Sequence, residues 1–437
     1  MHFRRFFSIF FSNVGGATPS ELRGLILTSN TVKQKKRLLT IIMAGGRGER
    51  LYPLTKSRAK PAVSFAGSYR VIDFTLSNCL NSGIKNVYLL TQYSSMTLDR
   101  HIHLAWNFFN RELGEFLDTV PPQHLIANKW YEGTADSVYQ NIHLLDAHRP
   151  EMVLILSGDH VYKMDYGQMV AFHLEKKAHL TVATVDMPIE QSSRFGVLEM
   201  DSKNRLIGFE EKPERGKPHP QDPSKILINM GVYVFDTATL VRALIEDYKR
   251  DSRHDFGGDI IPMMIQKGMK VYGYEFVDEN RKEFKYWRDI GDLDSFYEAN
   301  MDQVQVTPIF NLYDEDWPIH TYREPGPPAK TVFDWPGRRG IALNSLLSTG
   351  VIISGSLVER SILSPHVHIH SYSHISDSIL MPRVEVEEGC RIHHAIIDEN
   401  VQIPRGVEIG VNPEQDARRF TISKNGVVVV PSGYVFE

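Results

Sequence analysis

The sequence predicts an α/β fold in which a mostly parallel sheet carries helices on both faces and is followed by a parallel β-helix. Between residues 37 and 300, short apolar and β-branched runs alternate with helical stretches. That alternation is typical of a parallel sheet covered on both faces. Beyond residue 346, apolar residues recur about every six positions and no helical stripe is present, which is the pattern of a hexapeptide-repeat solenoid.

Apolar runs bounded by polar residues or glycine mark the strands of the predicted sheet. The first run, LLTIIMAGG from Leu38, ends at two glycines, which predicts a buried strand entering a turn. Helices are predicted at residues 137–148 and 239–250. Ligands of such folds bind at the carboxyl ends of the strands, so we expect the functional site there. Further strands are predicted at residues 86–93, 152–159, 179–187 and 231–236.

Changes in composition divide the chain into segments. A stretch rich in Pro, Gly and Trp separates the two predicted folds and indicates a linker. Beyond it, Val384, Cys390 and Ile396 form one apolar file, which coils of a solenoid bury by stacking on one another. The alternative for this part is a small irregular β domain. The predicted segments are a poorly ordered tail (1–36), the sheet domain (37–300), the linker (301–345) and the β-helix (346–437).

Composition excludes several classes of protein. The 437 residues carry a net charge of −4, which argues against nucleic acid as a partner. The two cysteines, Cys79 and Cys390, lie far apart and no Cys/His zinc spacing occurs, so neither a disulfide framework nor a structural zinc site is expected. No apolar run has the length of a membrane span, and the basic, aromatic start lacks a clear cleavage site. We therefore expect a cytoplasmic protein with no membrane partner.

The strongest chemical signal is the segment AGGRGERLYPLTKSRAKPAV, residues 44–63. Its glycines leave backbone N–H groups free to approach an anion, and its cations match the charge of a triphosphate. A Walker loop is excluded by spacing, and the dinucleotide fingerprint fails because Leu51 stands where its third glycine is required. The remaining alternative is a glycine turn with solvated basic residues. The residues concerned are Gly45, Gly46, Gly48, Arg47, Arg50, Arg58 and Lys60.

This segment resembles the signature of the sugar-1-phosphate nucleotidylyltransferases, most closely that of the bacterial glucose-1-phosphate adenylyltransferases. The resemblance covers roughly residues 38–420. It implies a Rossmann-like nucleotidyltransferase sheet followed by a left-handed β-helix. It also implies transfer of AMP from ATP to glucose 1-phosphate, with Mg²⁺, as the first committed step of glycogen synthesis. Further matching motifs are VIDFTLSNCLNSGI, WYEGTADSVYQN, SGDHVYKMDY, FEEKP, SRHDFGGDIIP, YWRDIG and DARRF.

Two aspartates match metal positions of the family. Asp159 ends the apolar run MVLILSG and so places a carboxylate at the carboxyl end of a strand, and Asp289 lies in YWRDIG. Carboxylates suit Mg²⁺, although an aspartate after a strand is, without the motif, usually a turn or cap residue. The resemblance makes Arg47, Lys60 and Asp159 the catalytic residues, with the two cations stabilising charge on the phosphates and on the departing pyrophosphate.

The resemblance also assigns residues to the two substrates. Gln92 follows a strand and is placed to read the base edge, while Trp130 is either its aromatic neighbour or a core residue. Asn229 stands where relatives carry Ser, which puts that one contact in doubt. The nucleotide-binding residues are Gly45, Gly46, Gly48, Arg50 and Gln92. The glucose-1-phosphate-binding residues are Tyr131, Gly196, Glu211, Lys212 and Asn229.

Members of the family are usually allosteric homotetramers with anionic effectors, so basic clusters are candidate effector residues. Ser57, Ser64, Arg383 and Glu399 differ in charge or size from their family counterparts, which leaves the effector open. Solvated basic side chains are the alternative. The candidates are Lys56, Arg58, Arg70, Arg418 and Arg419.

A histidine cluster lies in the predicted β-helix. His366, His368 and His370 are spaced by two, which places them on one face of a strand, with His374 close behind. This arrangement is a candidate metal site, but solvent-facing histidines are the favoured interpretation.

Three alternatives to adenylyl transfer remain. They are the same fold forming dTDP- or UDP-glucose, an acyltransferase built on the hexapeptide solenoid, and a catalytically silent regulatory subunit. The last is disfavoured because Arg47, Lys60, Asp159, Lys212 and Asp289 are all present.

Overall fold

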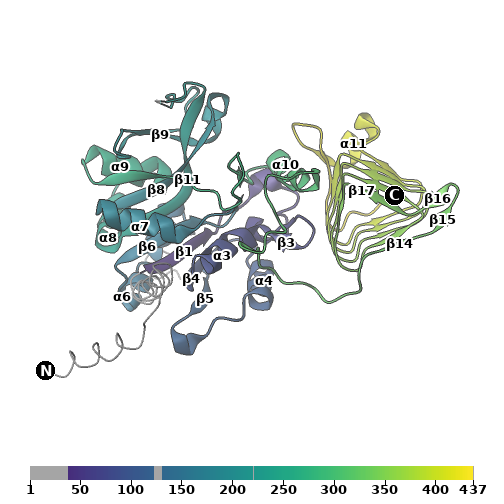
Figure 1. The fold of residues 1–437 in the computed structure, drawn as a ribbon, viewed down its shortest axis with the longest axis horizontal. Helices are drawn as coiled ribbons and strands as arrows, with labels where there is room; N and C mark the ends of the chain where they lie inside the picture. Colours follow the sequence, from purple (N-terminus) through teal and green to yellow (C-terminus); the bar gives the residue numbers. More distant parts are fainter. Residues whose placement is uncertain (1–37, 123–129, 220, 437) are drawn as a thin grey trace, which may run out of the picture.

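The computed structural model describes residues 38–122, 130–219 and 221–436. An α/β domain and a C-terminal β-helix lie side by side, with α10 (Leu293–Met301) between them (Figure 1). The tail predicted at residues 1–36 falls outside the described residues. In the described ranges, no helix combines the length and apolar character that a membrane span requires.

The central strands of the α/β domain form the parallel sheet that the sequence predicted. The strand β1 (Leu38–Ala44) pairs in parallel with β4 (Asn86–Thr91) on one side and with β6 (Met152–Ser157) on the other. Beyond β4, β5 (Phe116–Val120) continues the parallel arrangement. The carboxyl ends of β1, β4 and β6 therefore meet at one edge of the sheet, which is where the glycine-rich segment begins.

The remaining strands extend the sheet beyond β6. The long strand β11 (Lys225–Asp236) runs antiparallel to β6, and its pairing with β8 changes register between Asn229 and Tyr233. This irregularity brings the backbone of Gly231, at φ 70°, toward the parallel half of the sheet. The other strands of this half are β8 (Leu180–Pro188), β9 (Gly196–Met200), β10 (Leu206–Glu211) and β12 (Val271–Glu275).

Helices cover both faces of the sheet because successive strand residues point to opposite sides. Ile42 packs in the core beneath α3, α4 and α7, whereas Ile41 packs in the core beneath α5, α8 and α9. The bounds of these helices are α3 (Val71–Asn81), α4 (Met96–Ala105), α5 (Thr134–Gln140), α6 (His143–His148), α7 (Tyr166–Lys176), α8 (Thr237–Tyr248) and α9 (Ile261–Gln266).

The single helix predicted at residues 137–148 is two helices, α5 and α6. They are separated at Asn141, whose buried amide donates hydrogen bonds to the Ser137 carbonyl (2.8 Å) and to the Tyr131 hydroxyl (2.9 Å). The Tyr131 hydroxyl lies outside the helix, and an asparagine whose side chain hydrogen-bonds in this way favours the end of a helix over its interior. The break therefore comes from a tertiary contact that apolar periodicity does not record.

The β-helix consists of three parallel ladders, and the predicted apolar file Val384, Cys390 and Ile396 is buried in it. One ladder is β14 (Lys330–Val332), β19 (Ile352–Ser354), β22 (His368–Ile369), β25 (Glu385–Val386) and β28 (Gln402–Ile403). The second is β17 (Ile341–Leu343), β20 (Leu357–Glu359), β23 (His374–Ser376), β26 (Arg391–His393) and β29 (Glu408–Ile409). The third is β18 (Leu346–Leu347), β21 (Ile362–Leu363), β24 (Ile379–Leu380), β27 (Ala395–Ile397) and β31 (Val428–Val430).

One helix and several short strands lie outside the main sheet and the three ladders. The helix α11 (Pro413–Arg419) lies between β29 and β31 in the chain. The short strands are β2 (Ser64–Phe65), β3 (Tyr69–Arg70), β7 (His160–Tyr162), β13 (Trp287–Asp289), β15 (Asp334–Trp335), β16 (Arg338–Arg339) and β30 (Thr421–Ile422).

The β-helix begins earlier than the sequence predicted. Its first strand, β14, starts at Lys330 and pairs in parallel with β19, inside the segment 301–345 that was expected to be a linker. Apolar residues are sparse in this first coil, and β14 is half-buried or exposed. The six-residue apolar pattern is therefore weak where the solenoid starts.

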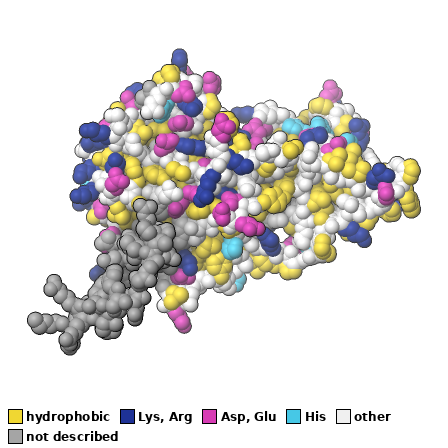
Figure 2. Space-filling view, in the orientation of Figure 1, with side chains coloured by type: hydrophobic (Ala, Val, Ile, Leu, Met, Phe, Trp, Pro, Cys, Tyr) yellow, Lys and Arg dark blue, Asp and Glu magenta, His cyan; other side chains and the backbone are white. Residues whose placement is uncertain are grey.

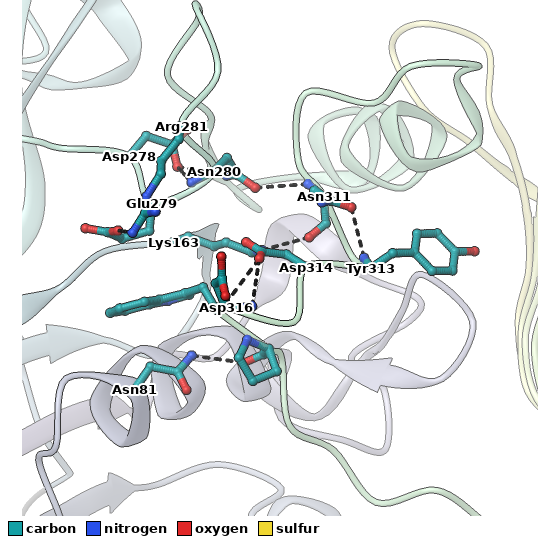
Figure 3. A network of polar contacts seen from close by, with 12 residues as sticks. Asn81, Lys163, Asp278, Glu279, Asn280, Arg281, Asn311, Tyr313, Asp314 and Asp316 are labelled. Atoms are coloured by element: carbon teal, nitrogen blue, oxygen red, sulfur yellow. Dashed lines mark hydrogen bonds and ion pairs between the residues drawn. The ribbon is translucent and has the colours of Figure 1, made fainter.

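The rest of the predicted linker packs firmly on the α/β domain. Phe310 and Ile319 are buried in a core that also contains Phe74 of α3 and Ile379 of the β-helix. A polar network holds the same segment (Figure 3): the fully buried Lys163 ammonium lies 2.8 Å from the Asp314 carboxylate and donates to the Asn311 carbonyl at 2.8 Å. The segment thus joins both domains instead of separating them.

Charges of both signs are interspersed over the face of the molecule in Figure 2. No extended basic surface is visible on that face, in line with the net charge of −4. That face offers no continuous track for a polyanion.

We predict that Asp314→Ala lowers the stability of the protein. The change removes the carboxylate that neutralises the buried ammonium of Lys163 and leaves it the Asn311 carbonyl as acceptor, and breaking such a pair typically costs about 3–5 kcal/mol. Chemical denaturation measures the loss. Glu315→Ala removes the neighbouring exposed carboxylate and serves as the control. Equal unfolding midpoints for both variants would contradict the prediction.

Candidate active site

The glycine-rich segment follows β1 and packs against two other parts of the site. Gly48 has φ +66°, and a Cβ at this position would lie 3.2 Å from the Cβ of Lys60. On the other side, a Cβ on Gly45 would lie 3.1 Å from the Cβ of Gln92. A left-handed backbone with such close neighbours requires glycine at position 48. The backbone of this loop is thereby fixed between Lys60 and Gln92.

Lys60 forms the centre of a cluster of charges. Its Nζ donates to Oδ2 of Asp159 at 2.6 Å and lies 3.7 Å from Oδ1 of Asp289. Burial of the side chain would lower the pKa of Lys60, but the charges of Asp159 and Asp289 outweigh burial and the pKa is raised. The ammonium therefore stays charged and holds the two acids beside the glycine loop.

The pairing of two short strands brings the two acids together. Asp159 follows β6 and directly precedes β7, and Asp289 ends β13, where it pairs with His160 of β7. The His160 Nε2 lies 3.6 Å from Asp159 Oδ1 and 3.8 Å from Asp289 Oδ1. Burial would raise the pKa of Asp159, yet Lys60 and His160 lower it well below its usual range. Asp159 is consequently an ionised carboxylate at neutral pH.

These residues have the composition of a divalent cation site. One ligand atom each from Asp159, His160 and Asp289 lies within 4.8 Å of the other two. Carboxylate oxygens are the ligands that hard divalent cations prefer. The sequence singled out both aspartates but missed His160, whose available signal was its place directly after Asp159.

Gln92, which the sequence assigns to the nucleotide, is hydrogen-bonded to Tyr131, which the sequence assigns to the sugar phosphate. Oε1 of Gln92 accepts from the backbone N–H of Tyr131 at 2.9 Å. Nearby, the rings of Tyr93 and Trp130 stack with centroids 5.0 Å apart, and the guanidinium of Arg47 lies 5.1 Å from the centre of Tyr93. Half of the Trp130 surface is exposed, so Trp130 is not a core residue. Tyr93 was not predicted.

The strands β9 and β10 bring together three of the residues predicted to bind the sugar phosphate. Gly196 pairs with Glu211, and a Cβ on Gly196 would come within 2.6 Å of the Phe209 ring. Lys212, which follows β10, is exposed and lies 3.0 Å from the Glu211 carboxylate. Glycine is needed at position 196 because any larger residue would collide with Phe209. The side chains of Glu211 and Lys212 are exposed to solvent.

Asn229 connects this side to the acidic cluster. Its Oδ1 accepts from the N–H of Gly231 at 2.9 Å, and its Nδ2 donates to the Tyr233 hydroxyl at 2.9 Å. A Cβ on Gly231 would lie 3.3 Å from Cε1 of His160. The irregular turn of β11 therefore places Asn229 next to the strands that carry Asp159 and Asp289. Both polar atoms of the Asn229 amide therefore have hydrogen-bond partners within the protein.

Two of the motifs that the sequence shares with the family contact each other. Thr134, in WYEGTADSVYQN, donates through its hydroxyl to the Asp255 carboxylate of SRHDFGGDIIP at 2.7 Å. A Cβ on Gly133 would come within 2.2 Å of the Arg253 carbonyl oxygen. A Cβ on Gly257 would lie 3.5 Å from Nδ2 of Asn229. The contacts position the Tyr131 loop relative to the sugar-phosphate side.

The candidate effector residues separate into two groups. Arg58 is buried and lies 2.7 Å from Asp398 and 2.9 Å from Glu399 of the β-helix, and Arg70 lies 2.8 Å from the same Glu399. Burial would raise the pKa of Glu399, but both arginines outweigh it and lower the pKa. The charges of Arg58 and Arg70 are thus matched inside the protein.

The other candidate effector residues lie on the surface. Lys56 and Arg418 are exposed, and the guanidinium of Arg419 in α11 stacks over Phe420 at 4.7 Å. A role of these residues in binding effectors stays a prediction.

Comparison with known families matches both domains. The nucleotidyl transferase family model matches residues 39–306, and the GlmU-like C-terminal hexapeptide model matches residues 327–430. The second match starts close to β14, in agreement with the early start of the β-helix. The active-site residues described above up to Asp289 lie in the first match.

Curated relatives cover nearly the whole chain. A glucose-1-phosphate adenylyltransferase from Koribacter versatilis is 47% identical over 403 residues, or 91% of this chain and 96% of the relative. One from Rhodopirellula baltica is 50% identical over 404 residues, covering 91% and 90% of the two chains. Glucose-1-phosphate adenylyltransferase 2 from Vibrio parahaemolyticus is 50% identical over 401 residues, covering 91% and 99%.

Proposed function

The chain belongs to the glucose-1-phosphate adenylyltransferases of the nucleotidyl transferase family, and we infer from this membership that it transfers AMP from ATP to α-D-glucose 1-phosphate. The products are ADP-glucose and pyrophosphate, and the reaction is the first committed step of glycogen synthesis. The observation that carries this reading is the position of Lys60, which holds Asp159 and Asp289 against the glycine loop.

We propose that the reaction is an in-line displacement. A phosphate oxygen of glucose 1-phosphate attacks the α-phosphorus of ATP, and the bond from that phosphorus to the bridging oxygen breaks as pyrophosphate leaves. Such a transfer depends on positioning and on stabilising charge more than on a protein nucleophile. The backbone N–H groups of the glycine loop bind phosphate oxygens, and the exposed Arg47 and Arg50 add charge at its open side.

Lys60 has a different part in this proposal. Its ammonium is 8% exposed and is fixed by two carboxylates, so it cannot follow a departing group. We propose that it orders the acids and presents one cation to the phosphates from a fixed point. Preorganised charge of this kind stabilises a transition state without reorganisation during the reaction.

Members of this family use a divalent metal, and we propose Mg²⁺ as the ion. Asp159 and Asp289 would hold it, with His160 beside them, since their ligand atoms lie within 4.8 Å of one another. When bound, Mg²⁺ neutralises the charge of the triphosphate and aligns it. Gln92 binds the nucleotide in this proposal, and the sugar phosphate is bound by Tyr131, Gly196, Glu211, Lys212 and Asn229.

The main alternative is transfer to the same sugar phosphate from another nucleotide. We expect ATP to give the highest rate of pyrophosphate release when ATP, UTP, dTTP and GTP are compared with glucose 1-phosphate. Release with each nucleotide is measured with and without Mg²⁺. A preference for UTP or dTTP would overturn the adenylyl assignment, and no release from any of them would indicate a silent subunit.

We predict that Asp159→Asn lowers kcat by roughly 10²–10³-fold, the size of effect found when one preorganised electrostatic partner is lost. The folded state is kept because the amide has nearly the same shape and Asp289 still faces Lys60. Asp146→Asn, an exposed position in α6, is the control. A kcat equal to that of the unchanged enzyme, with the circular dichroism spectrum preserved, would remove Asp159 from the catalytic set.

We also propose that anionic metabolites regulate the enzyme, and that Glu399 competes with them for Arg58 and Arg70. An anion can bind these arginines only by displacing the Glu399 carboxylate, which lies 2.9 and 2.8 Å from them. The homotetramer and the cytoplasmic location expected from the sequence stay predictions.

Glu399→Gln is predicted to increase the affinity of anionic effectors about tenfold, because a hydrogen bond between charged groups contributes about 1.5–3 kcal/mol. Inorganic phosphate is the probe, and its effect on the initial rate gives the apparent binding constant. Arg58 keeps its bond to Asp398 in this variant. Glu387→Gln, at an exposed position of the same domain, is the control, and an unchanged constant in Glu399→Gln would contradict the competition.

A further inference from the structure

Two histidines and a glutamate converge on the outer surface of the β-helix, away from the proposed active site. His368 lies in β22 and His370 directly follows this strand, and their ring centroids are 4.0 Å apart. Nε2 of His370 lies 3.0 Å from Oε1 of Glu385, and Nδ1 of His368 lies 3.7 Å from the same oxygen. One ligand atom from each residue lies within 4.8 Å of the other two.

The repeat of the solenoid produces this arrangement. His368 of β22 is in register with Glu385 of β25 on the next coil, while Ile369 and Val386 between the outward positions stack in the core. The backbone N–H of His370 also donates to the Val386 carbonyl at 2.9 Å. The three side chains are therefore fixed by paired strands, and their approach does not depend on a loop.

We propose that His368, His370 and Glu385 bind a divalent transition-metal ion of the zinc class. Imidazole nitrogen suits Zn²⁺, Co²⁺, Ni²⁺ and Cu²⁺, whereas Mg²⁺ prefers oxygen ligands alone. Bonds of 2.0–2.1 Å in a tetrahedral site place ligand atoms about 3.3 Å apart, and the measured separations of 3.0 and 3.7 Å lie on either side of that value. A fourth position remains for water.

The electrostatics of the cluster agree with a metal site. A neutral imidazole keeps a lone pair for a metal ion, and the carboxylate balances the charge of the ion. All three side chains are half-buried, so they are partly desolvated but reachable from solvent.

The other histidines that the sequence placed near this face have different neighbours. His366 lies 3.9 Å from Glu324, and His374 lies 3.0 Å from Glu359 in the adjacent ladder. The structure thus selects two histidines of the predicted cluster and adds Glu385, which sequence spacing could not connect to them. His374 provides a matched control, because it is paired with one glutamate, Glu359, and belongs to no three-residue ligand cluster among the described residues.

Titration of the full-length protein with Co²⁺ tests the site through the visible absorption of the bound ion. Excess Mg²⁺ is present throughout, to occupy the carboxylate-rich cluster of Asp159 and Asp289. We expect one equivalent of Co²⁺ to bind the unchanged protein and His374→Ala, with displacement by Zn²⁺. The same equivalent is expected to be lost in His370→Ala and in Glu385→Gln.

Thermal unfolding supplies a second readout, because an ion held by two coils stabilises the folded state by mass action. Zn²⁺ is expected to raise the Tm of the unchanged protein and of His374→Ala, but not that of His370→Ala. The proposal is overturned if the unchanged protein binds no Co²⁺, or if His370→Ala and Glu385→Gln bind it as the unchanged protein does. Circular dichroism of each variant without metal shows whether the solenoid is intact.

Discussion

The buried ammonium of Lys60 is the interaction on which the proposed catalytic geometry depends. It reaches both Asp159, at 2.6 Å, and Asp289, at 3.7 Å, although these residues lie 130 positions apart in the sequence. A Cβ on Gly48 would lie 3.2 Å from the Cβ of Lys60, so one residue contacts both the glycine-rich loop and the acidic cluster. Two carboxylates this close would repel each other without a cation between them.

Much of the α/β domain follows from local sequence patterns. Ile41 and Ile42 lie in opposite cores, as expected for a strand covered on both faces, and the run that begins at Leu38 ends where the phosphate loop starts. The departures come from tertiary contacts. Asn141 ends a helix because its amide serves Tyr131, and the buried pair of Lys163 and Asp314 anchors a segment whose composition predicted a linker.

The candidate site shows the same division. Some site residues lie in motifs whose composition predicts their chemistry, and the structure brings three of them together: Gly48, Lys60 and Asp159. His160 was missed because one histidine carries no signal apart from its neighbours. The pairing of Arg58 with Glu399 was also missed, because it joins positions at the two ends of the chain and forms only when the domains pack.

The β-helix therefore contributes more than a scaffold. Its carboxylates neutralise arginines of the α/β domain, and Ile379 shares a core with Phe74 of α3. A shift of the β-helix would move the carboxylates that pair with Arg58. Arg58 lies two residues before Lys60 in the sequence. This continuity gives a physical connection between the solenoid and the catalytic edge of the sheet.

The affinity of the protein for ATP, measured by titration calorimetry with and without Mg²⁺, tests the central claim most directly. If the glycine loop binds the triphosphate while Asp159 and Asp289 hold its divalent ion, ATP binds measurably and binds more tightly when Mg²⁺ is present. The account is contradicted if ATP does not bind in excess Mg²⁺, or if it binds equally well when divalent ions have been removed.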